Sequence, residues 1–389
     1  MRLLHVVSSV DRRFGGPIEG VLQRGLRLRE MGHQIEVASS DDPEAPHVGA
    51  FPLPVHALGP PRRGGYYYAA SLRPWLRAHA GGYDAVIVNG LWQYHSLAAW
   101  QVMRELQRPY VIFTHGMLDP WFNRAYPLKR LKKLLYWPWA EYRVLRDAAA
   151  VLFTSEDERL LARQSFWPYR ARECVVAYGT RQPPQDAAPL RDAFLAAHPE
   201  LRGKRVLLFL GRLHAKKGCD LIVEAFARVA AEEPHLHLLM AGPDQTGWVG
   251  DLKARAQTLG LAERITWPGM LEGDAKWGAF YASEAFMLPS HQENFGISVA
   301  EALGCGLPVL ISDKVNIWRE VLDAQAGLVA EDSEAGTLGN LKAWLALSAE
   351  DRAAMAERTR ALFADRFSVE RMATALIDVV SAVQAAPRT

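Results

Sequence analysis

The stretch of this 389-residue chain that is richest in potential chemistry runs from Pro289 to Val309, with the sequence PSHQENFGISVAEALGCGLPV. It follows a short apolar strand and opens a helix, and Glu293 and Glu301 stand eight residues apart in it. The first N–H groups of a helix have no internal acceptor and carry a partial positive charge, which attracts anions. Gly296 allows a phosphate to approach the backbone closely. A carboxylate beside a phosphate site favours a ligand with both hydroxyls and phosphate, such as a nucleotide sugar. The alternative is a helix with a capping glutamate and a solvated one.

A second stretch, GRLHAKKG from Gly211 to Gly218, follows a predicted strand at 205–210. It places Arg212 and Lys217 at the carboxyl end of that strand, beside the first site. Arginine offers a planar fork to phosphate oxygens, and lysine offers a compact charge. Two cations that neutralise a diphosphate leaving group are what a transferase without a metal needs. The alternative is an ordinary basic loop that leads into a helix.

The first half of the chain offers a histidine and a glycine-rich loop. His115 and Gly116 end a predicted strand at 109–114, which directs His115 into a cleft, although a lone histidine is more often structural. Gly15-Gly16 can present backbone N–H groups to a phosphate. The G-x-G-x-x-G spacing of dinucleotide-binding proteins is absent from this loop. Asp41-Asp42 follows the second strand as a ribose-binding acid would, which keeps a dehydrogenase interpretation open.

These residues must be positioned by strands and helices, which the sequence predicts in alternation throughout. Short apolar runs without polar alternation favour parallel sheets that are covered on both faces. Two such alternations predict two doubly wound α/β domains, with ligands bound in the cleft between them. The predicted strands are 2–8, 34–39, 84–89, 109–114, 150–154 and 174–178 in the first half, and 205–210, 236–241, 264–267, 285–288, 307–311 and 327–330 in the second.

Local signals predict helix boundaries and a linker. Residues 18–31 are expected to form a helix that ends before Gly32. Ser155 and Glu158 are spaced as a capping box, so the acidic cluster around them indicates a helix start rather than a metal site. The Pro-rich segment 181–189 is the best linker candidate, and the last ~55 residues are expected to be helical.

Composition excludes several classes of protein. Hydrophobic residues make up 49% of the chain and charged residues 23%, as in soluble globular domains. The net charge of +2 argues against a nucleic-acid partner, although residues 1–180 hold 23 Lys and Arg against 16 Asp and Glu, a net of +7, and the rest carries −5. The three cysteines lie far apart, which supports neither disulfides nor a zinc site and favours a cytoplasmic location. The sequence shows no signal peptide and no apolar stretch of ~18 residues.

The combination of GRLHAKKG, PSHQENFGISVAEALGCGLPV, the GGP loop and THG resembles the retaining GT-B glycosyltransferases of family 4. The resemblance spans most of the chain and is strongest over 205–311, where Glu293 and Glu301 match the E-x7-E motif of that family. It implies an α/β GT-B fold in which two Rossmann-like domains face each other across a cleft. The implied parts are an acceptor-binding domain at 1–182, a nucleotide-sugar-binding domain at 190–367, and a last helix at 368–389 that crosses back to the first domain.

The resemblance also implies roles for single residues. Glu293 should contact hydroxyls of the donor sugar, Glu301 should hold the ribose, and His115 should lie by the reacting sugar and assist transfer. Met270, after a predicted Pro268-Gly269 turn, should lie where the backbone meets the base. No metal or other cofactor is implied, and the chain has no D-x-D motif. The residues expected to meet the diphosphate are Gly16, Arg212, Lys217, Phe295, Gly296 and Ile297.

Two departures from the family pattern concern hinge and sugar contacts. Tyr178-Gly179 stands where Asn-Gly is usual, and Asp313 to Trp318 replaces a glycine-rich stretch. The extension after THG, Leu118 to Trp121, resembles transferases of bacterial surface-polysaccharide (exopolysaccharide) assembly. The predicted reaction is retaining transfer of a hexose-type sugar to a lipid-linked or saccharide acceptor. The alternative is a nucleotide-sugar epimerase of the same fold, and a non-catalytic partner subunit ranks behind both.

Residues 121–146 have the composition of a helix that lies on a membrane surface. Basic residues outnumber acids by seven to one, and leucines fall at helical spacing between them. Aromatic rings in the segment favour the headgroup level of a bilayer. We therefore predict docking on an anionic membrane, at the inner face of the plasma membrane. The alternative packs the leucines and tryptophans on the sheet and leaves a solvated basic face. The residues concerned are Arg124, Lys129, Arg130, Lys132, Lys133, Arg143 and Arg146; Leu128, Leu131, Leu134 and Leu135; and Trp121, Tyr126, Tyr136, Trp137, Trp139 and Tyr142.

Overall fold

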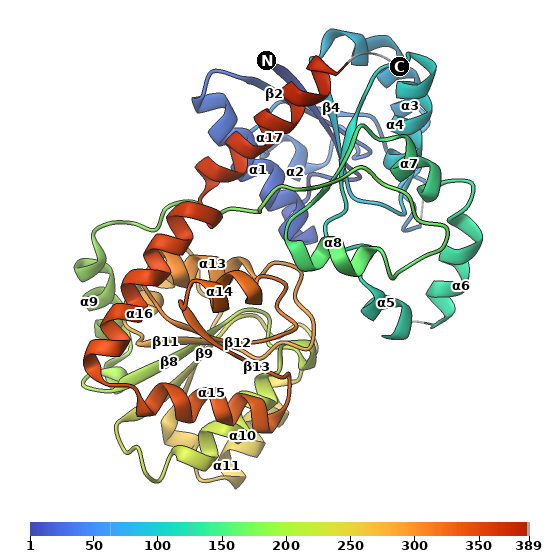
Figure 1. The fold of residues 1–389 in the computed structure, drawn as a ribbon. Helices are drawn as coiled ribbons and strands as arrows, with labels where there is room; N and C mark the ends of the chain where they lie inside the picture. Colours follow the sequence, from blue (N-terminus) through green and yellow to red (C-terminus); the bar gives the residue numbers. More distant parts are fainter. Residues whose placement is uncertain (63, 126, 387–389) are drawn as a thin grey trace. The chain divides into compact units, whose positions relative to one another are not determined.

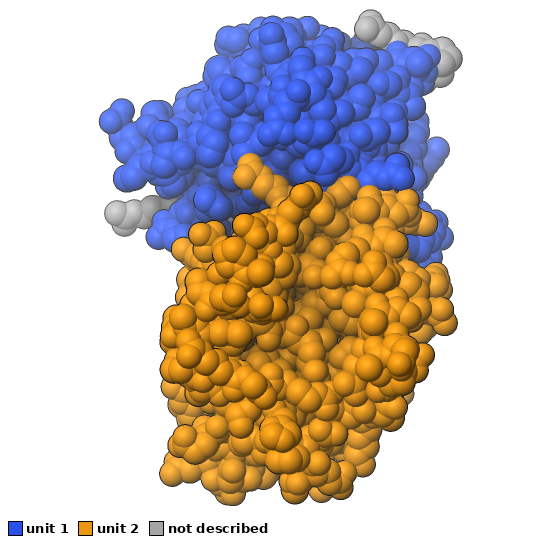
Figure 2. All heavy atoms as spheres, turned by 90° about the vertical axis from the view of Figure 1, so that its left-hand side faces the viewer, with its two compact units in different colours: residues 1–180, 369–389 blue, residues 181–368 orange. Residues whose placement is uncertain are grey.

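The computed structural model describes residues 1–62, 64–125 and 127–386 of the chain. The chain divides into two compact units, Met1–Thr180 with Val369–Thr389, and Arg181–Ser368 (Figure 2). Each unit is built around one parallel sheet with helices on its faces (Figure 1). The predicted class, α/β with two Rossmann-like sheets, is confirmed.

The sheet of the first unit has seven strands in the order β3-β2-β1-β4-β5-β6-β7. All neighbouring pairs are parallel, as the continuous apolar runs predict. The strand β3 was not predicted, because three residues are too few to show a pattern. The predicted strand 174–178 is wrong in its extent, since β7 ends at Val175. The strands are β1 (Arg2–Val6), β2 (Gln34–Ser39), β3 (Val55–Ala57), β4 (Ala85–Asn89), β5 (Val111–Phe113), β6 (Ala150–Phe153) and β7 (Glu173–Val175).

Two apolar clusters cover the two faces of this sheet. One face packs against α1 and α17, and the other against α3, α4 and α7. The last helix of the chain, α17, lies beside α1, so the two ends of the chain share one face of the first sheet (Figure 1). The helices are α1 (Gly16–Glu30), α2 (Pro46–Gly49), α3 (Leu72–His79), α4 (Tyr94–Glu105), α5 (Pro120–Ala125), α6 (Pro127–Tyr136), α7 (Glu141–Asp147), α8 (Glu156–Ala162) and α17 (Val369–Ala385).

The sheet of the second unit has six strands in the order β10-β9-β8-β11-β12-β13, again all parallel. Helix α10 packs against α15, and α12 packs against α9. The strands are β8 (Arg205–Leu210), β9 (Leu236–Ala241), β10 (Ile265–Gly269), β11 (Ala285–Leu288), β12 (Val309–Ser312) and β13 (Gly327–Ala330). The helices are α9 (Ala187–Ala197), α10 (Cys219–Val229), α11 (Val249–Thr258), α12 (Gly273–Tyr281), α13 (Ile297–Gly304), α14 (Trp318–Asp323), α15 (Glu334–Ala346) and α16 (Ala349–Leu362), followed by a π-turn at Phe363–Phe367.

Local signals placed some boundaries and misplaced others. Helix α1 ends as predicted, with Gly32 at φ 86° and a hydrogen bond from His33 N to Leu28 O. The predicted Pro268-Gly269 turn is wrong, since both residues lie in β10. A proline is tolerated there because β10 is an edge strand with a register shift. Among the described helices, none is long and apolar enough to span a bilayer.

Candidate active site

Two loops at the carboxyl ends of β8 and β11 lie against each other in the second unit. The carbonyl oxygen of Lys216 accepts hydrogen bonds from His291 N and from the Ser290 hydroxyl, both at 2.9 Å. Gly218 has φ 67°, and a Cβ at this position would lie 2.2 Å from the Pro289 carbonyl oxygen. Only glycine permits so close an approach. The loop that carries Arg212 and Lys217 is therefore fixed beside the loop that carries Glu293.

Lys217 and Glu293 form an ion pair, with side chains that are 13% and 20% exposed. Burial opposes ionisation of Glu293, but the Lys217 ammonium holds the pKa of this carboxyl below its ordinary value. Arg212 is exposed, and its guanidinium donates to Gln245 Oε1 at 3.3 Å. One edge of the sheet thus presents two cations and an ionised carboxylate, groups that can bind phosphate and sugar hydroxyls together.

The backbone of Glu293 is held by the segment that follows β12. Glu293 N donates to the Lys314 carbonyl at 2.9 Å, and Asn316 N donates to the Glu293 carbonyl at 3.0 Å. The sequence marked this segment only as a departure from the family pattern. Its role was missed because pairing through main-chain groups leaves no trace in side-chain types.

The start of α13 has no side-chain cap. Its N-cap is Gly296, with φ 80°, and the helix begins at Ile297. Val299 N already donates to the Gly296 carbonyl at 2.9 Å. The partial positive charge at this end of the helix favours an anion near the amides that precede Val299. Phe295 has a structural role as well, because its ring is buried and packs edge-on against Phe367 with centroids 5.5 Å apart.

Glu301 is buried and accepts a hydrogen bond from Lys276 Nζ at 2.7 Å. This ion pair fixes one carboxylate oxygen, so a ribose at Glu301 would meet a lysine as well. Lys276, in α12, was not among the predicted site residues, since a lysine in a first helical turn has no distinctive pattern. Met270 follows β10 and is 62% exposed, and the neighbouring Gly269 carbonyl accepts from Gly242 N at 2.7 Å. Met270 therefore stays at the carboxyl edge of the sheet.

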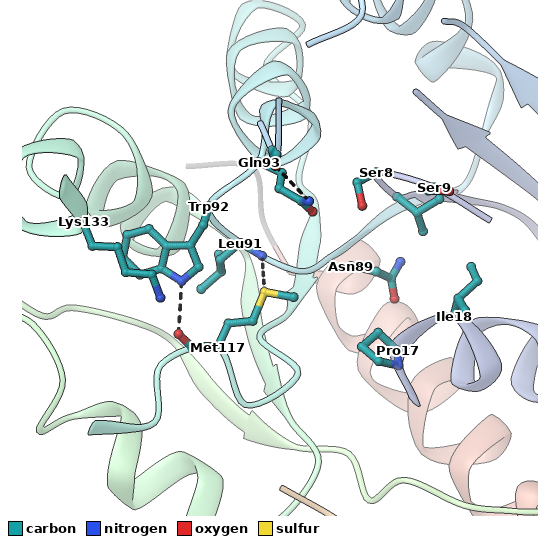
Figure 3. A pocket seen from close by; sticks show the side chains of 12 residues that line it. Ser8, Ser9, Pro17, Ile18, Asn89, Leu91, Trp92, Gln93, Met117 and Lys133 are labelled. Atoms are coloured by element: carbon teal, nitrogen blue, oxygen red, sulfur yellow. Dashed lines mark hydrogen bonds between the residues drawn. The ribbon is translucent and has the colours of Figure 1, made fainter. Parts of the chain in front are cut away.

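A pocket of about 370 Å³ opens at the carboxyl ends of the strands in the first unit (Figure 3). Its lining combines apolar side chains with neutral hydroxyls and amides, and it includes one charged residue, Lys133. The lining residues come from the ends of β1 and β4, the start of α1, and the loops after β3 and β5, with Lys133 from α6. They are Val7, Ser8, Ser9, Pro17, Ile18, Gly65, Asn89, Leu91, Trp92, Gln93, Met117 and Lys133.

His115 lies next to this pocket, with Nε2 3.4 Å from the Oδ1 atom of Asn89, a lining residue. Its backbone adopts φ 49°, and its ring stacks on Phe113 with centroids 5.4 Å apart. Burial, the Arg24 guanidinium and His95 lower the pKa of His115 to about 3. The imidazole is therefore neutral near pH 7, and it can accept or donate one hydrogen bond but carries no charge.

The turn that carries His115 is held by Glu158. One carboxylate oxygen accepts from the Thr114 hydroxyl at 2.5 Å and from Gly116 N at 2.6 Å. The other accepts from the amide and the hydroxyl of Thr154, at 2.7 and 2.6 Å. The predicted capping box is half wrong. Ser155 does cap α8 through Glu158 N, but the Glu158 carboxylate holds the neighbouring strand ends.

Gly16 begins α1, and its carbonyl accepts a hydrogen bond from the Tyr178 hydroxyl at 2.6 Å. The departure at Tyr178 therefore supports the glycine loop, and Gly20 makes room for its ring. Asp41 is buried and accepts from the Ser9 hydroxyl and from Val10 N, at 2.5 and 2.8 Å. These bonds engage both oxygens of Asp41, which argues against its use as a ribose-binding acid.

Comparison with known families matches both units. Residues 191–362 match the family of glycosyl transferases group 1, and residues 15–179 match the glycosyl transferase 4-like domain. The chain is 26% identical over 394 aligned residues to the D-inositol 3-phosphate glycosyltransferase of Rhodococcus erythropolis, covering 94% of this chain and 86% of that protein. It is 30% identical to the mannosylfructose-phosphate synthase of Agrobacterium fabrum, but that match spans 35% of this chain and 31% of the relative.

Among solved structures, Anabaena HepE in complex with UDP has a TM-score of 0.80 and 19% sequence identity, covering 98% of this chain and 100% of that one. This likeness concerns the fold, two parallel-sheet domains of the GT-B type. The two family matches lie on the two units and together leave only short segments unmatched. The chain is therefore a glycosyltransferase of the group 1 family, with the GT-B fold.

Proposed function

We propose that this glycosyltransferase takes a hexose-type sugar from a nucleoside diphosphate, without a metal, and transfers it with retention of anomeric configuration. The observation that carries this proposal is the joined pair of loops in the second unit. Lys217 and Arg212 lie on one loop, and Glu293 lies on the other, directly before the uncapped start of α13. Cations and helix amides suit the diphosphate, and the carboxylate suits sugar hydroxyls.

The assignment of roles follows from this arrangement. Arg212, Lys217 and the backbone of 295–297 bind the diphosphate, Glu293 orients the sugar, and Glu301 binds the ribose. In the first unit, Gly16 approaches the diphosphate, and His115, being neutral, assists transfer through a hydrogen bond. Met270 lies at the edge where the base binds. UDP-sugars are the first donors to test, since the solved structure of Anabaena HepE contains UDP.

An epimerase of the same fold is the second candidate, and the pocket in the first unit argues against it. Elimination and readdition need an acid or a base at the sugar. Among the described residues that line the pocket, none is a carboxylate. The carboxylate that holds the His115 turn, Glu158, accepts four hydrogen bonds from that turn and from Thr154.

The test of the reaction class is release of nucleoside diphosphate in the presence and absence of acceptor. Wild-type protein is incubated with UDP-, GDP- and dTDP-sugars and with lipid-linked, oligosaccharide and phosphorylated polyol acceptors, the last because of the name of the Rhodococcus relative. A transferase releases diphosphate only with an acceptor, and NMR of the product gives the anomeric configuration. Interconversion of nucleotide sugars without acceptor would instead establish the epimerase.

We further propose that the acceptor is lipid-linked, as in surface-polysaccharide assembly, and is met at the inner face of an anionic membrane through α6. The side chains of Leu128, Leu131 and Leu135 are 82%, 60% and 71% exposed, so they do not pack on the sheet. Trp139 and Trp167 are also exposed, at 51% and 88%. Trp137 was predicted among the aromatic rings at the membrane surface, and this is wrong because it is buried and its indole donates to the Pro168 carbonyl at 2.8 Å. Tyr126 and the side chain of Arg124 lie outside the described residues.

Exposed leucines beside Arg130 and Lys132 support binding to anionic lipid, since each basic residue near such a surface contributes about 1 kcal/mol. Co-sedimentation with liposomes tests this. Binding should require anionic lipid, fall with salt, and weaken in a Leu128→Ser, Leu131→Ser, Leu135→Ser variant. The matched control is Leu322→Ser, which changes an exposed leucine of the second unit. Equal binding to neutral liposomes, or none to anionic ones, would contradict the membrane proposal.

A further inference from the structure

Helix α6 exposes its leucines together with Lys129, Arg130 and Lys132, and Lys133 is the basic residue of this helix that is partly buried. A helix on the surface of a domain ordinarily turns its leucines inward and its lysines outward. In α6 the leucines are exposed, whereas Lys133 is partly buried and lines the pocket of the first unit (Figure 3). Partial burial of an ammonium group costs free energy, whereas partial burial of a leucine at this position would not. Lys133 therefore presents an ammonium group to the pocket.

Burial lowers the pKa of Lys133 to about 8, and the nearby Glu141 carboxylate acts to raise it, so the lysine is mostly charged at pH 7. Its Nζ lies 4.4 Å from the centroid of the Trp92 ring, and among the described residues it has no ion-pair partner. The buried carboxylate of Glu141 lies near enough to act on the ammonium, but its Oε1 is used by Trp92 N at 2.6 Å and by the Ser96 hydroxyl at 3.0 Å. Glu141 supports Trp92 through Oε1, and its buried Oε2 has no hydrogen-bond partner among the described residues, Lys133 included.

Trp92 forms a fixed aromatic wall beside the lysine. Its backbone has φ 70°, a conformation that is rare for a bulky residue and that Glu141 stabilises through the amide. Its indole N–H donates to the Met117 carbonyl at 3.1 Å. Ser8, Asn89 and Gln93 add neutral groups that can bind hydroxyls. A pocket of about 370 Å³ with an aromatic wall and such groups suits a sugar or polyol ring.

We propose that Lys133 binds a phosphate group of the acceptor while the acceptor ring lies in this pocket against Trp92. The proposal rests on the proposed function, because it assigns the pocket to the acceptor. Phosphate fits because Lys133 is the one charged residue among the described residues of the lining and its charge is positive. The phosphate can belong to a soluble sugar or polyol phosphate, or to the diphosphate of a lipid-linked saccharide. The outward leucines of the same helix favour the second source, since a helix is only ~10 Å across.

The experiment compares binding of glucose 1-phosphate, free glucose and a short-chain prenyl-diphosphate-linked glucose, by calorimetry with UDP at saturation. Wild-type protein should bind both phosphorylated probes more tightly than glucose. Lys133→Gln should weaken the phosphorylated probes about tenfold or more and leave glucose within twofold, and Lys133→Arg should recover most of the loss. The matched control is Lys132→Gln, an exposed neighbour on the same helix.

The outcomes separate this proposal from the proposed function. Tighter binding of the prenyl-linked probe than of glucose 1-phosphate assigns the phosphate to a lipid-linked acceptor, and equal binding assigns it to a soluble one. Equal binding of glucose and glucose 1-phosphate by wild type, or the same loss in Lys132→Gln as in Lys133→Gln, would overturn the role of Lys133. Failure of the proposed function would appear elsewhere, as absence of acceptor-dependent diphosphate release and of UDP binding.

Discussion

The carboxyl edges of the two sheets use carboxylates in opposite ways. In the second unit, Glu293 and Glu301 are paired with Lys217 and Lys276, so acids and bases face the same edge and can exchange partners with a ligand. In the first unit, Glu158 and Glu141 are buried and accept hydrogen bonds from loop backbone and hydroxyl groups.

This difference indicates that the acids of the two units have different roles. The diphosphate that we propose to bind at the second unit needs positive charge, and Arg212 and Lys217 can supply it. The first unit uses its acids to hold loops in strained shapes, such as those of Trp92 and His115, and presents mostly neutral groups to the pocket. We call the carboxyl edges of the sheets in the first and second units the first edge and the second edge. Acids of the second edge should affect turnover through ligand contacts, and acids of the first edge should affect turnover through loop geometry.

The largest expected effect is at the second edge, where Glu293→Ala should lower turnover about 100-fold. Loss of a sugar contact that is strongest in the transition state costs ~3 kcal/mol. Affinity for the nucleoside diphosphate should stay within a few fold, as measured by calorimetry. Glu272→Ala, an exposed glutamate before α12, is the control. A folded Glu293→Ala protein with near wild-type turnover would remove Glu293 from the site.

Next comes Glu158→Gln, which tests the first edge. The amide has one acceptor oxygen, so it cannot satisfy four donors, and we expect a loss of 2–4 kcal/mol of unfolding free energy, roughly the cost of one or two unmet buried bonds. Turnover should fall about tenfold while diphosphate affinity is retained, because the His115 turn shifts. Urea unfolding and calorimetry check the two parts. Unchanged stability would show that Glu158 is not the support described here.

Smaller effects are expected for the cations of the second edge. Lys217→Ala and Arg212→Lys should each weaken diphosphate binding about tenfold, the latter because the planar fork is lost. Lys217→Ala should also raise the pKa of Glu293, since the ammonium is what holds it down. The turnover of this variant should then fall at a higher pH than that of wild type as acid is added. Unchanged diphosphate affinity in both variants would place the phosphate site elsewhere.

How far the sequence predicts each edge depends on how its residues are spaced along the chain. The second edge is made of two short loops whose chemistry is contiguous, and the predicted residues Arg212, Lys217 and Glu293 do lie together. The first edge depends on partners more than 40 positions apart, Glu158 with Gly116 and Glu141 with Trp92. No pattern along the chain marks such pairs. The sequence likewise gives no means of distinguishing Lys133 from the six other basic residues of 121–146, and its partial burial is seen only in the fold.

The alternation of strands and helices was predictable for a related reason. Each apolar run is a local signal, and both parallel sheets follow from it. The prediction missed the short strand β3 and misplaced the end of the edge strand β10, because few of their residues are buried and the apolar pattern is weak. The exposure of Leu128, Leu131 and Leu135 could not be predicted either, because a pattern of leucines looks the same whether it packs on a sheet or faces outward.

The smallest expected effect concerns the neutral state of His115. Its pKa is lowered to about 3 by burial and by Arg24, against about 6.5 in the unfolded chain. Between these values the unfolded state binds a proton that the folded state does not. The stabilisation is therefore complete above pH 6.5 and is lost as the pH falls, by up to about 1.4 kcal/mol per pH unit. His115→Gln removes this term, so the free energy of unfolding of the variant should fall less than that of wild type between pH 7 and pH 5.

Urea unfolding at pH 7, 6 and 5 measures this difference, with His79→Gln, an exposed histidine of the same unit, as the control. We expect the gap between wild type and His115→Gln to change by about 1–2 kcal/mol over the range, and the gap for His79→Gln to stay constant. The result bears on mechanism because a neutral His115 gives turnover no ionisation between pH 5 and 8. A parallel pH dependence in wild type and His115→Gln would mean that this histidine titrates like an exposed one. His115 would then be an ionisable group beside the pocket of the first unit, and the contrast between the neutral hydrogen-bonding groups of that unit and the charged groups of the second would be wrong at this residue.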